Sequence, residues 1–277
     1  MRVAFLGPSG TFTEEALRAS APPGVEEVPY PTVYETVMAV HSGAVERAVV
    51  PIENSLEGSV TSTLDTLAGE ADDVTIVAEV VHPISHCLLA RTALPLDRVR
   101  RVISHPQGVA QCRRFLTEAL PGVEVMSSPS TADAVRTVSI AQEDWAAIGP
   151  RLAADLYGCE VLAEDVQDSP DNVTRFVWLA PRGTEVEGSA SKTSVVFWGF
   201  NDDSPGALMR VLSEFAERDV NLTKIESRPR RGQLGHYMFF ADLEGGERSD
   251  AVAGALDGLR GRVETLKVLG SYPAWEA

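Results

Sequence analysis

Thr174 is the residue of this sequence best suited to act as a neutral hydrogen-bond donor in a reaction. It follows a Ser-Pro-Asp-Asn turn (169–172) and precedes the apolar run 177–180, a pattern that predicts a loop entering a buried strand. A hydroxyl held there, beside Arg175 and Phe176, can donate to a leaving oxygen over an apolar surface. The alternative interpretation is a threonine that merely suits a strand, as β-branched residues do.

Polar loops recur along the first 160 residues, each after a short apolar strand and before a helix. They lie at Gly7, Asn54, Ser104, Ser130 and Gly149. This alternation predicts an α/β architecture with a largely parallel sheet. Because such proteins bind ligands at the loops beyond the strand ends, we expect these loops to converge on one cleft.

The first two loops contain several possible donors. Ser9 and Thr11 lie in a glycine-rich turn that opens a helix, where backbone N–H groups suit an anion. Asn54 and Ser55 can each donate to a carboxylate or a hydroxyl. The alternative for each loop, taken alone, is a turn that only caps a helix.

The third loop combines glutamines with a serine and a histidine. Pro106 suits the first turn of a helix, on which Gln107 and Gln111 would share one face. Ser104 and His105 do not predict a catalytic pair, because adjacent residues rarely face one another and no orienting acid accompanies them.

The composition is that of a globular protein. With 44% hydrophobic and 23% charged residues it is ordinary for this class, and the length of 277 residues favours two domains, or a two-lobed domain plus a smaller one. No apolar run approaches the roughly 18 residues of a membrane span and no signal peptide is visible, so we expect a cytoplasmic protein without a membrane partner. The net charge of −16 argues against nucleic acid as a partner. An anionic small substrate stays compatible with it, because charges beyond about 8 Å are screened.

Cysteine and histidine spacing predicts neither disulfides nor a metal site. The three cysteines are odd in number and lack CxxC spacing, which favours reduced thiols in the core. His82 and His86 are four residues apart, but Pro83 interrupts a helix there and no further ligand completes a set.

A polar, small-residue stretch at 183–192 predicts a linker between two domains. Beyond it, strands are expected at 193–200, 222–226, 235–243 and 264–269. Helices at 207–217 and 250–259 complete the order βαββαβ, the ferredoxin-like plan.

Taken together, these motifs resemble the prephenate dehydratase family, followed by an ACT regulatory domain. The resemblance covers nearly the whole chain, and it is the combination and order of the motifs that is specific. Because no chorismate mutase segment is seen before Met1, the sequence is similar to the monofunctional branch of the family. The stretches that carry it are GPSGTFTEEA (7–16), PIENSLEG (51–58), SHPQ (104–107) with Gln111, STADA (130–134), 149–154, NVTRF (172–176), PGAL (205–208) and ESRP (226–229).

The resemblance implies a two-lobed catalytic domain like a type 2 periplasmic binding protein at 1–182, with the second lobe at about 81–160. The linker at 183–192 and the ACT domain at 193–277 follow. It implies decarboxylative dehydration of prephenate to phenylpyruvate in L-phenylalanine biosynthesis, by a hydro-lyase that needs no cofactor or metal, is regulated by phenylalanine and forms a homodimer or homotetramer. Pro129 stands where some relatives carry an acid, so either an acid is not a general requirement there or another residue of this chain has taken its role.

The resemblance also implies site residues. Thr174 would be the catalytic hydroxyl and Phe176 would pack against the ring. The substrate-binding set would be Ser9, Thr11, Asn54, Ser55, Ser104, Gln107, Gln111, Ser130, Thr131, Arg175 and Phe176. The phenylalanine-binding set would be Asn201, Pro205, Gly206, Ala207, Leu208, Asn221, Leu222, Glu226 and Ser227. Arogenate dehydratase is the nearer alternative function, and a non-enzymatic solute-binding protein is the more distant one.

Overall fold

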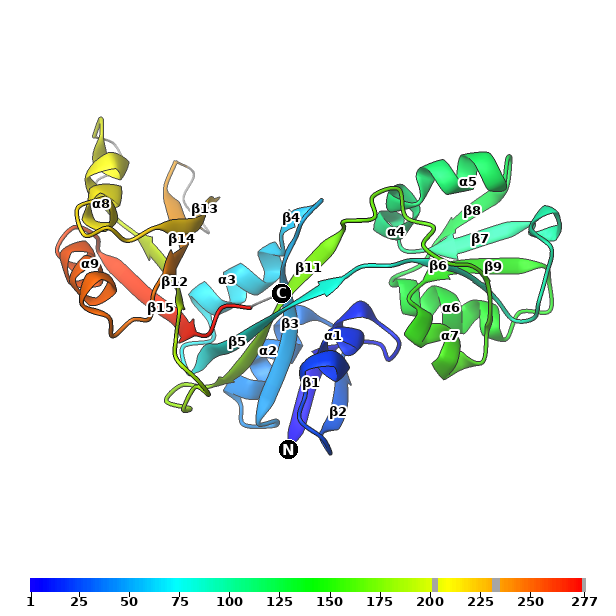
Figure 1. Cartoon of the computed structure of the whole chain (residues 1–277), viewed down its shortest axis with the longest axis horizontal. Coiled ribbons are helices and arrows are strands. Elements are labelled where there is room, and N and C mark those ends of the chain that lie inside the picture. The colour runs from blue at the N-terminus through cyan, green and yellow to red at the C-terminus, as the bar shows by residue number, and fades with distance from the viewer. Residues whose placement is uncertain (201–203, 231–234, 276–277) are drawn as a thin grey trace. The chain divides into compact units, whose positions relative to one another are not determined.

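The computed structural model describes residues 1–200, 204–230 and 235–275. The chain forms two compact units, each assembled from separate stretches of sequence (Figure 1). The first unit comprises Met1–Thr36, Ala48–Val60 and Val80–Phe176, and the second comprises Val37–Arg47, Thr61–Glu79 and Val177–Ala277. The expected domain limits at 182 and 193 stay predictions.

Most elements of the first unit alternate between strand and helix, as the sequence predicts. They are β1 (Arg2–Leu6), α1 (Phe12–Ser20), β2 (Glu26–Tyr30), β3 (Arg47–Asn54), β4 (Gly58–Ser59), β6 (Cys87–Ala90), the 3-10 helix η1 (Leu96–Arg98), β7 (Arg101–Ser104), α4 (Pro106–Gln111), α5 (Arg113–Ala119), β8 (Glu124–Ser127), α6 (Thr131–Ser139), β9 (Trp145–Gly149), α7 (Arg151–Tyr157) and β10 (Glu160–Ala163). Four elements run across a unit boundary: β3, through its first residue, and α2 (Val33–His41), β5 (Val74–Pro83) and β11 (Val173–Pro181).

A five-stranded sheet in the first unit has the strand order β10-β6-β9-β7-β8. β7 is parallel to β8 and β9, whereas β6 is antiparallel to β9 and β10. Four of the five strands therefore point the same way and β6 alone among them is reversed, so the sheet is largely parallel in strand direction, as expected, although two of its four pairings are antiparallel. The chain between the parallel strands β7 and β8 contains α4 and α5, and the chain from β8 to β9 contains α6, as crossovers between parallel strands require.

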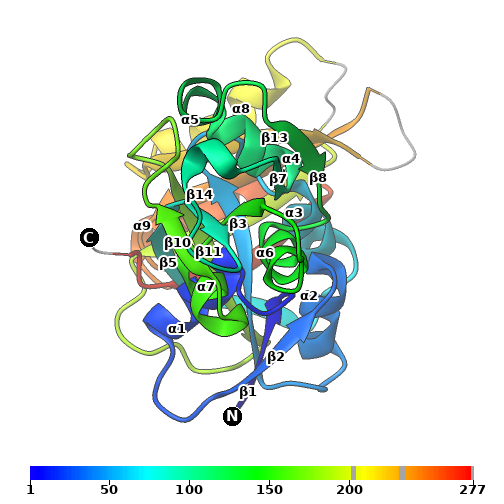
Figure 2. The same cartoon turned by 90° about the vertical axis from the view of Figure 1, so that its right-hand side faces the viewer.

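Helices cover both faces of this sheet. Successive strand residues point to opposite sides, and both sets of side chains are apolar and buried here. Leu89, Ile103 and Ala147 pack against α6 and α7. Leu88, Val102 and Ile148 pack on the side of α5. The two helical layers are visible above and below the sheet in Figure 1 and around it in Figure 2.

The C-terminal part of the second unit has the predicted βαββαβ order. Its elements are β12 (Lys192–Trp198), α8 (Ala207–Ala216), β13 (Leu222–Pro229), β14 (Tyr237–Glu244), α9 (Asp250–Arg260) and β15 (Thr265–Tyr272), and α3 (Thr61–Gly69) also lies in this unit. The strands pair antiparallel in the order β13-β14-β12-β15, which confirms the ferredoxin-like plan.

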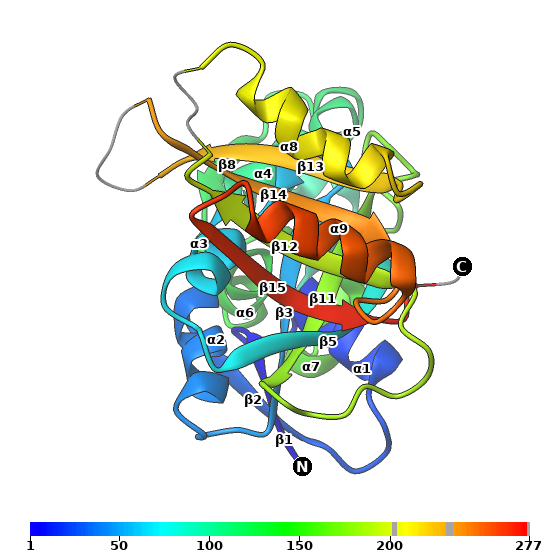
Figure 3. The ribbon, with the colours of Figure 1, turned by 90° about the vertical axis from the view of Figure 1, so that its left-hand side faces the viewer.

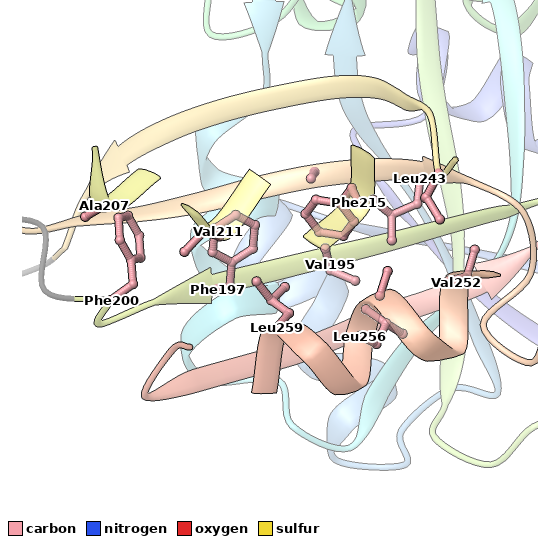
Figure 4. Packing of buried hydrophobic residues seen from close by; sticks show 13 residues of the cluster. Val195, Phe197, Phe200, Ala207, Val211, Phe215, Leu243, Val252, Leu256 and Leu259 are labelled. Carbon is pink, nitrogen blue, oxygen red and sulfur yellow. The ribbon is translucent and has the colours of Figure 1, made fainter. Parts of the chain in front are cut away.

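The two helices α8 and α9 lie on one face of these strands (Figure 3). Between helices and sheet, Phe197 of β12 and Phe215 of α8 are buried with Leu256 of α9 (Figure 4). This apolar layer accounts for the apolar stripes of both helices, whereas β12 itself is buried along residues 193–197.

The three cysteines are unpaired, and Cys87 and Cys112 are buried as expected for core thiols. Burial raises the pKa of Cys112 to about 12, so this thiol is held protonated and unreactive near neutral pH. In the part of the chain that the structure describes, no helix is long and apolar enough to cross a membrane.

Gly270 offers a test of the packing in the second unit. A Cβ atom there would lie 2.7 Å from Ile76 Cβ and would overlap the Ile76 carbonyl oxygen, where β15 meets β5. We expect Gly270→Ala to lower the free energy of unfolding by about 1–3 kcal/mol, the usual effect of overpacking. Urea unfolding measures it, with Gly261→Ala as the matched control because a Cβ at Gly261 meets nothing closer than 3.5 Å. Equal stabilities of the two variants would contradict this packing.

Candidate active site

A cavity of about 390 Å³ lies within the first unit, and its volume falls in the range of roughly 300–1,000 Å³ typical of small-molecule sites. The loops after β1, β3, β7 and β8 line it together with the start of β11, so four of the five polar loops converge as predicted. The predicted site residues in its wall are Thr11, Asn54, Gln107, Gln111, Ser130, Thr131, Thr174 and Phe176.

The fifth predicted loop, at Gly149, is not part of this wall but supports it. A Cβ atom at Gly149 would lie 2.6 Å from Val135 Cγ2 and 3.2 Å from the Thr131 carbonyl oxygen. The glycine therefore allows the first turns of α6, which line the cavity through Thr131, to approach the end of β9.

Four predicted substrate-binding residues lie outside the cavity wall. Ser104 is fully buried and its hydroxyl donates to the Ile148 carbonyl (2.8 Å), tying β7 to β9. The other three also bond within the protein fold. Ser55 Oγ accepts from Val173 N (3.0 Å), Arg175 Nη1 donates to Glu53 Oε2 (3.3 Å) and the Ser9 carbonyl accepts from the Tyr157 hydroxyl (2.7 Å).

Thr11 and Ser130 line the cavity, but their hydroxyl protons are already used. Thr11 Oγ1 donates to the Leu6 carbonyl (2.9 Å) and caps α1 by accepting from Glu14 N (3.4 Å). Ser130 Oγ caps α6 by accepting from Asp133 N (2.9 Å) and lies 3.1 Å from Asp133 Oδ2, to which it donates. Both residues therefore bring a helix N-terminus to the cavity, where first-turn N–H groups and the helix dipole favour an anion.

The Asn54 side chain has a single possible amide orientation. Its Oδ1 accepts from the backbone N–H groups of Leu56 (2.9 Å) and Glu57 (3.0 Å). Two donors at one atom require that atom to be the oxygen. Asn54 Nδ2 therefore faces β11, where it donates to Thr174 Oγ1 (2.8 Å) and Asn172 Oδ1 (2.8 Å).

This orientation decides what the Thr174 hydroxyl can do. Thr174 is 8% exposed and lines the cavity, and its oxygen accepts a hydrogen bond from Asn54. Since a hydroxyl carries one proton, that proton is not used in the contact with Asn54. Thr174 therefore keeps its proton to donate elsewhere, with the cavity beside it.

The same directionality continues from Asn54 to a histidine. Asn172 Oδ1 accepts from Asn54, so Asn172 Nδ2 is the atom that donates to Gln111 Oε1 (3.2 Å). Gln111 Oε1 also lies 3.0 Å from His86 Nε2. Because this oxygen can only accept, His86 carries its proton on Nε2.

The cavity wall is neutral. Among the described residues that line it there is no Asp, Glu, Lys or Arg, and two histidines are its titratable groups. Burial lowers the pKa of His86, which favours its neutral form. His105 caps α4, its Nδ1 accepting from Gln107 N (3.3 Å). In residues 1–200, 204–230 and 235–275, no group of three or more His, Cys, Asp or Glu is placed to hold a metal ion.

The sequence analysis missed His86 and Asn172 as site residues. His86 is 2% exposed and packs edge to face on Phe12, with ring centroids 5.1 Å apart. Asn172 is 1% exposed. The signal that could have found His86 is a polar residue directly before the apolar run Cys87–Ala90, because a polar group buried with such a run needs hydrogen-bond partners.

The predicted phenylalanine-binding residues lie on α8 and β13 of the second unit and in the segments just before them, except Asn201, which is outside the described residues. Gly206 takes a positive φ of 76° and caps α8, and Ala207 is buried in the first turn. Glu226 on β13 lies 3.6 Å from Lys224 Nζ. The remaining positions are Pro205 and Leu208 around the start of α8, Asn221 before β13, and Leu222 and Ser227 on β13.

Comparisons with known proteins agree with the sequence motifs. A family model described as "Prephenate dehydratase" matches residues 3–184, and one described as "ACT domain" matches residues 200–261. A curated prephenate dehydratase of Mycobacterium sp. (strain JLS) is 42% identical over 288 residues, which cover 100% of this chain and 90% of the relative.

Several solved structures resemble the whole chain, among them the following two. A prephenate dehydratase of Arthrobacter aurescens in complex with L-Phe is 40% identical, with a TM-score of 0.89 and coverage of 98% of this chain and 90% of that one. A second structure, described as a novel type of quorum quenching acylase, is 34% identical, with a TM-score of 0.88 and coverage of 99% and 98%.

The lowered pKa of His86 predicts a pH-dependent contribution to stability. Below about pH 6.5 this histidine becomes protonated in the unfolded chain, while the folded protein resists protonation. Because the unfolded state then binds more protons, the free energy of unfolding decreases as the pH is lowered. The neighbouring charge of Glu15 and the Gln111 hydrogen bond act in the opposite direction but are smaller effects. We expect His86→Gln to gain stability relative to the wild type between about pH 7 and pH 5.

Urea unfolding of both proteins at several pH values measures this difference. Between about pH 7.5 and 9 the difference should stay constant, because the histidine is neutral in both states there. If the difference in unfolding free energy between the wild type and His86→Gln also stayed constant between about pH 7 and pH 5, this would contradict the buried, neutral state of His86.

Proposed function

Because the chain belongs to the prephenate dehydratase family, we propose that it converts prephenate to phenylpyruvate, water and carbon dioxide in the cavity beside Thr174. The observation that carries this proposal is the direction of the Asn54–Thr174 hydrogen bond. It provides a fixed neutral hydroxyl whose own proton is available for a leaving oxygen.

The reaction needs little more than this donor. The bond from the ring to its carboxylate breaks, and its electron pair enters the ring as carbon dioxide leaves. The ring C–O bond breaks at the same time, and the departing hydroxyl takes up one proton to become water. Aromatisation supplies the driving force. A positioned donor for the oxygen contributes roughly 10²- to 10⁴-fold in rate.

Thr174 is the donor that we assign to this oxygen. A free aliphatic hydroxyl is a weak acid, so its role is to polarise the leaving oxygen, and the proton consumed comes in the end from solvent. Asn54 acts through Thr174, because its Nδ2 fixes the oxygen at 2.8 Å. An amide that donates leaves the hydroxyl proton free, whereas a carboxylate at the same place would draw that proton away.

The cavity wall suits the charge change of this substrate. Prephenate carries two carboxylates, and we assign them to neutral donors such as the Gln111 amide and to the N-termini of α1 and α6. Apolar residues complete the wall, among them Ile84, Val60 and Phe176. An apolar surround favours loss of the ring carboxylate, because the products there are uncharged.

The test of the activity is turnover of prephenate by the purified protein, followed as phenylpyruvate. We expect Thr174→Ala to lower kcat by about 10²- to 10⁴-fold, because the donor to the leaving oxygen is lost. Thr174→Ser keeps a hydroxyl and should retain much more activity than the alanine variant. Near-wild-type turnover by Thr174→Ala would remove Thr174 from its role, and no turnover of prephenate by the wild type would overturn the proposed function.

Arogenate is the alternative substrate, since it differs by one amino group on the side chain. Parallel assays with both compounds decide between them. Acyl hydrolysis, the activity named for one of the similar structures, is less well supported. A nucleophilic hydroxyl needs a base to accept its proton, and the group bonded to Thr174 Oγ1 is the Asn54 amide, which donates.

For the second unit we propose regulation by L-phenylalanine, the ligand of the similar Arthrobacter aurescens structure. First-turn N–H groups of α8, around Ala207 and Leu208, would take the carboxylate, because Gly206 ends the preceding turn at a positive φ of 76°. Glu226 would take the ammonium group. Such a ligand changes activity only if it binds one state of the enzyme more tightly than another.

The effector proposal predicts a specific loss of affinity in a charge variant. Glu226→Gln removes the charge from the hydrogen bond to the ammonium group, which is worth about 1.5–3 kcal/mol, so binding of L-phenylalanine should weaken about tenfold or more. Isothermal titration calorimetry measures this, with the exposed Glu217→Gln on the same unit as the control. If saturating L-phenylalanine left both activity and hydrodynamic size unchanged in the wild type, the regulatory proposal would fail.

We further propose a homodimer or homotetramer that works in the cytoplasm. Three unpaired cysteines are typical of a reducing compartment. Light scattering during size-exclusion chromatography, with and without L-phenylalanine, determines the oligomeric state.

A further inference from the structure

His86 contributes a hydrogen bond to the candidate active site that the proposed mechanism does not use. Its side chain lines the cavity, is 2% exposed and donates from Nε2 to Gln111 Oε1 at 3.0 Å. Asn172 Nδ2 donates to the same oxygen at 3.2 Å. The Gln111 carbonyl oxygen is thus held by two buried donors, and its amide group must face the other way.

The position of the Gln111 amide matters for an anionic ligand. Gln111 Nε2 has two N–H bonds, one of which points toward Glu57 Oε1 at a distance of 3.5 Å. The second N–H is left for a ligand in the cavity that Gln111 lines. If the side chain turned over, its carbonyl oxygen would face Glu57 and the ligand, and its NH₂ group would face the donating Nδ2 of Asn172.

We propose that His86 is a positioning residue that holds Gln111 with its NH₂ group toward the substrate, and that it does so through Nε2. The inference rests on the proposed function, because the ligand is taken to be the dicarboxylate substrate. His86 itself transfers no proton. Its ring stays neutral, Nε2–H is committed to Gln111, and the protein offers Nδ1 no partner among the described residues.

Two substitutions at position 86 separate the ring nitrogens. The amide nitrogen of glutamine can reach the place of Nε2, whereas that of asparagine is shorter and reaches only the place of Nδ1. We expect His86→Asn to raise KM for prephenate about tenfold with a much smaller change in kcat, because one neutral hydrogen bond is worth about 0.5–1.5 kcal/mol. His86→Gln should recover most of the lost kcat/KM.

A double-mutant cycle shows whether His86 acts through Gln111. If it does, His86→Leu should have little further effect on KM once Gln111→Leu is present, so the two changes are not additive. Circular dichroism of each variant shows whether it is folded, and the cycle keeps the inference testable should one position-86 variant fold poorly.

Three outcomes would overturn the inference while leaving the proposed function in place, provided that the wild type turns over prephenate. They are rescue by asparagine but not by glutamine, additive effects of the two leucine changes, and loss of the acidic limb of the kcat/KM profile in His86→Gln. The last result would make His86 a proton carrier. A wild type inactive on prephenate would instead reject the proposed function.

Discussion

The site depends on two backbone N–H groups that bind one side-chain oxygen. Leu56 and Glu57 both donate to Asn54 Oδ1, and every other hydrogen-bond direction follows from that. Asn54 must donate to β11, Thr174 must accept, and Asn172, Gln111 and His86 fall into a single order of donors and acceptors. A buried network in which each polar group has one possible role is rigid, since any reversal leaves a donor facing a donor.

Rigidity of this kind suits a reaction in which the substrate itself supplies most of the driving force. The protein has to hold a hydroxyl in place and to accommodate two negative charges, one of which disappears. In the proposed reaction, a wall free of Asp, Glu, Lys and Arg among its described residues would do this with dipoles. Helix N-termini and amides stabilise an anion without the strong binding of a cation, which would disfavour loss of the ring carboxylate.

The fold serves the site by placing loops at the ends of strands. Ser104, Ser55 and Arg175 illustrate how polar residues of the motifs support this arrangement without lining the cavity. Ser104 joins β7 to β9, and Ser55 joins the loop after β3 to β11. A motif residue can therefore be structurally required and still lie outside the wall.

The sequence alone determined the order and type of most elements, the ferredoxin-like plan of the last 85 or so residues, and the position of Thr174 at the start of a buried strand. These follow from local patterns: apolar periodicity, turn residues and helix caps. Four of five polar loops could be placed at one cavity on the same grounds.

Only the tertiary structure decided which side chains of those loops have protons to offer. Thr11 and Ser130 donate to acceptors three to five residues away in the chain, whereas the Thr174 oxygen accepts a hydrogen bond from Asn54, 120 positions away, and keeps its own proton. His86 is bonded to Gln111 across 25 positions. Hydrogen-bond direction depends on partners that are distant in sequence, and no local pattern of residue types encodes it.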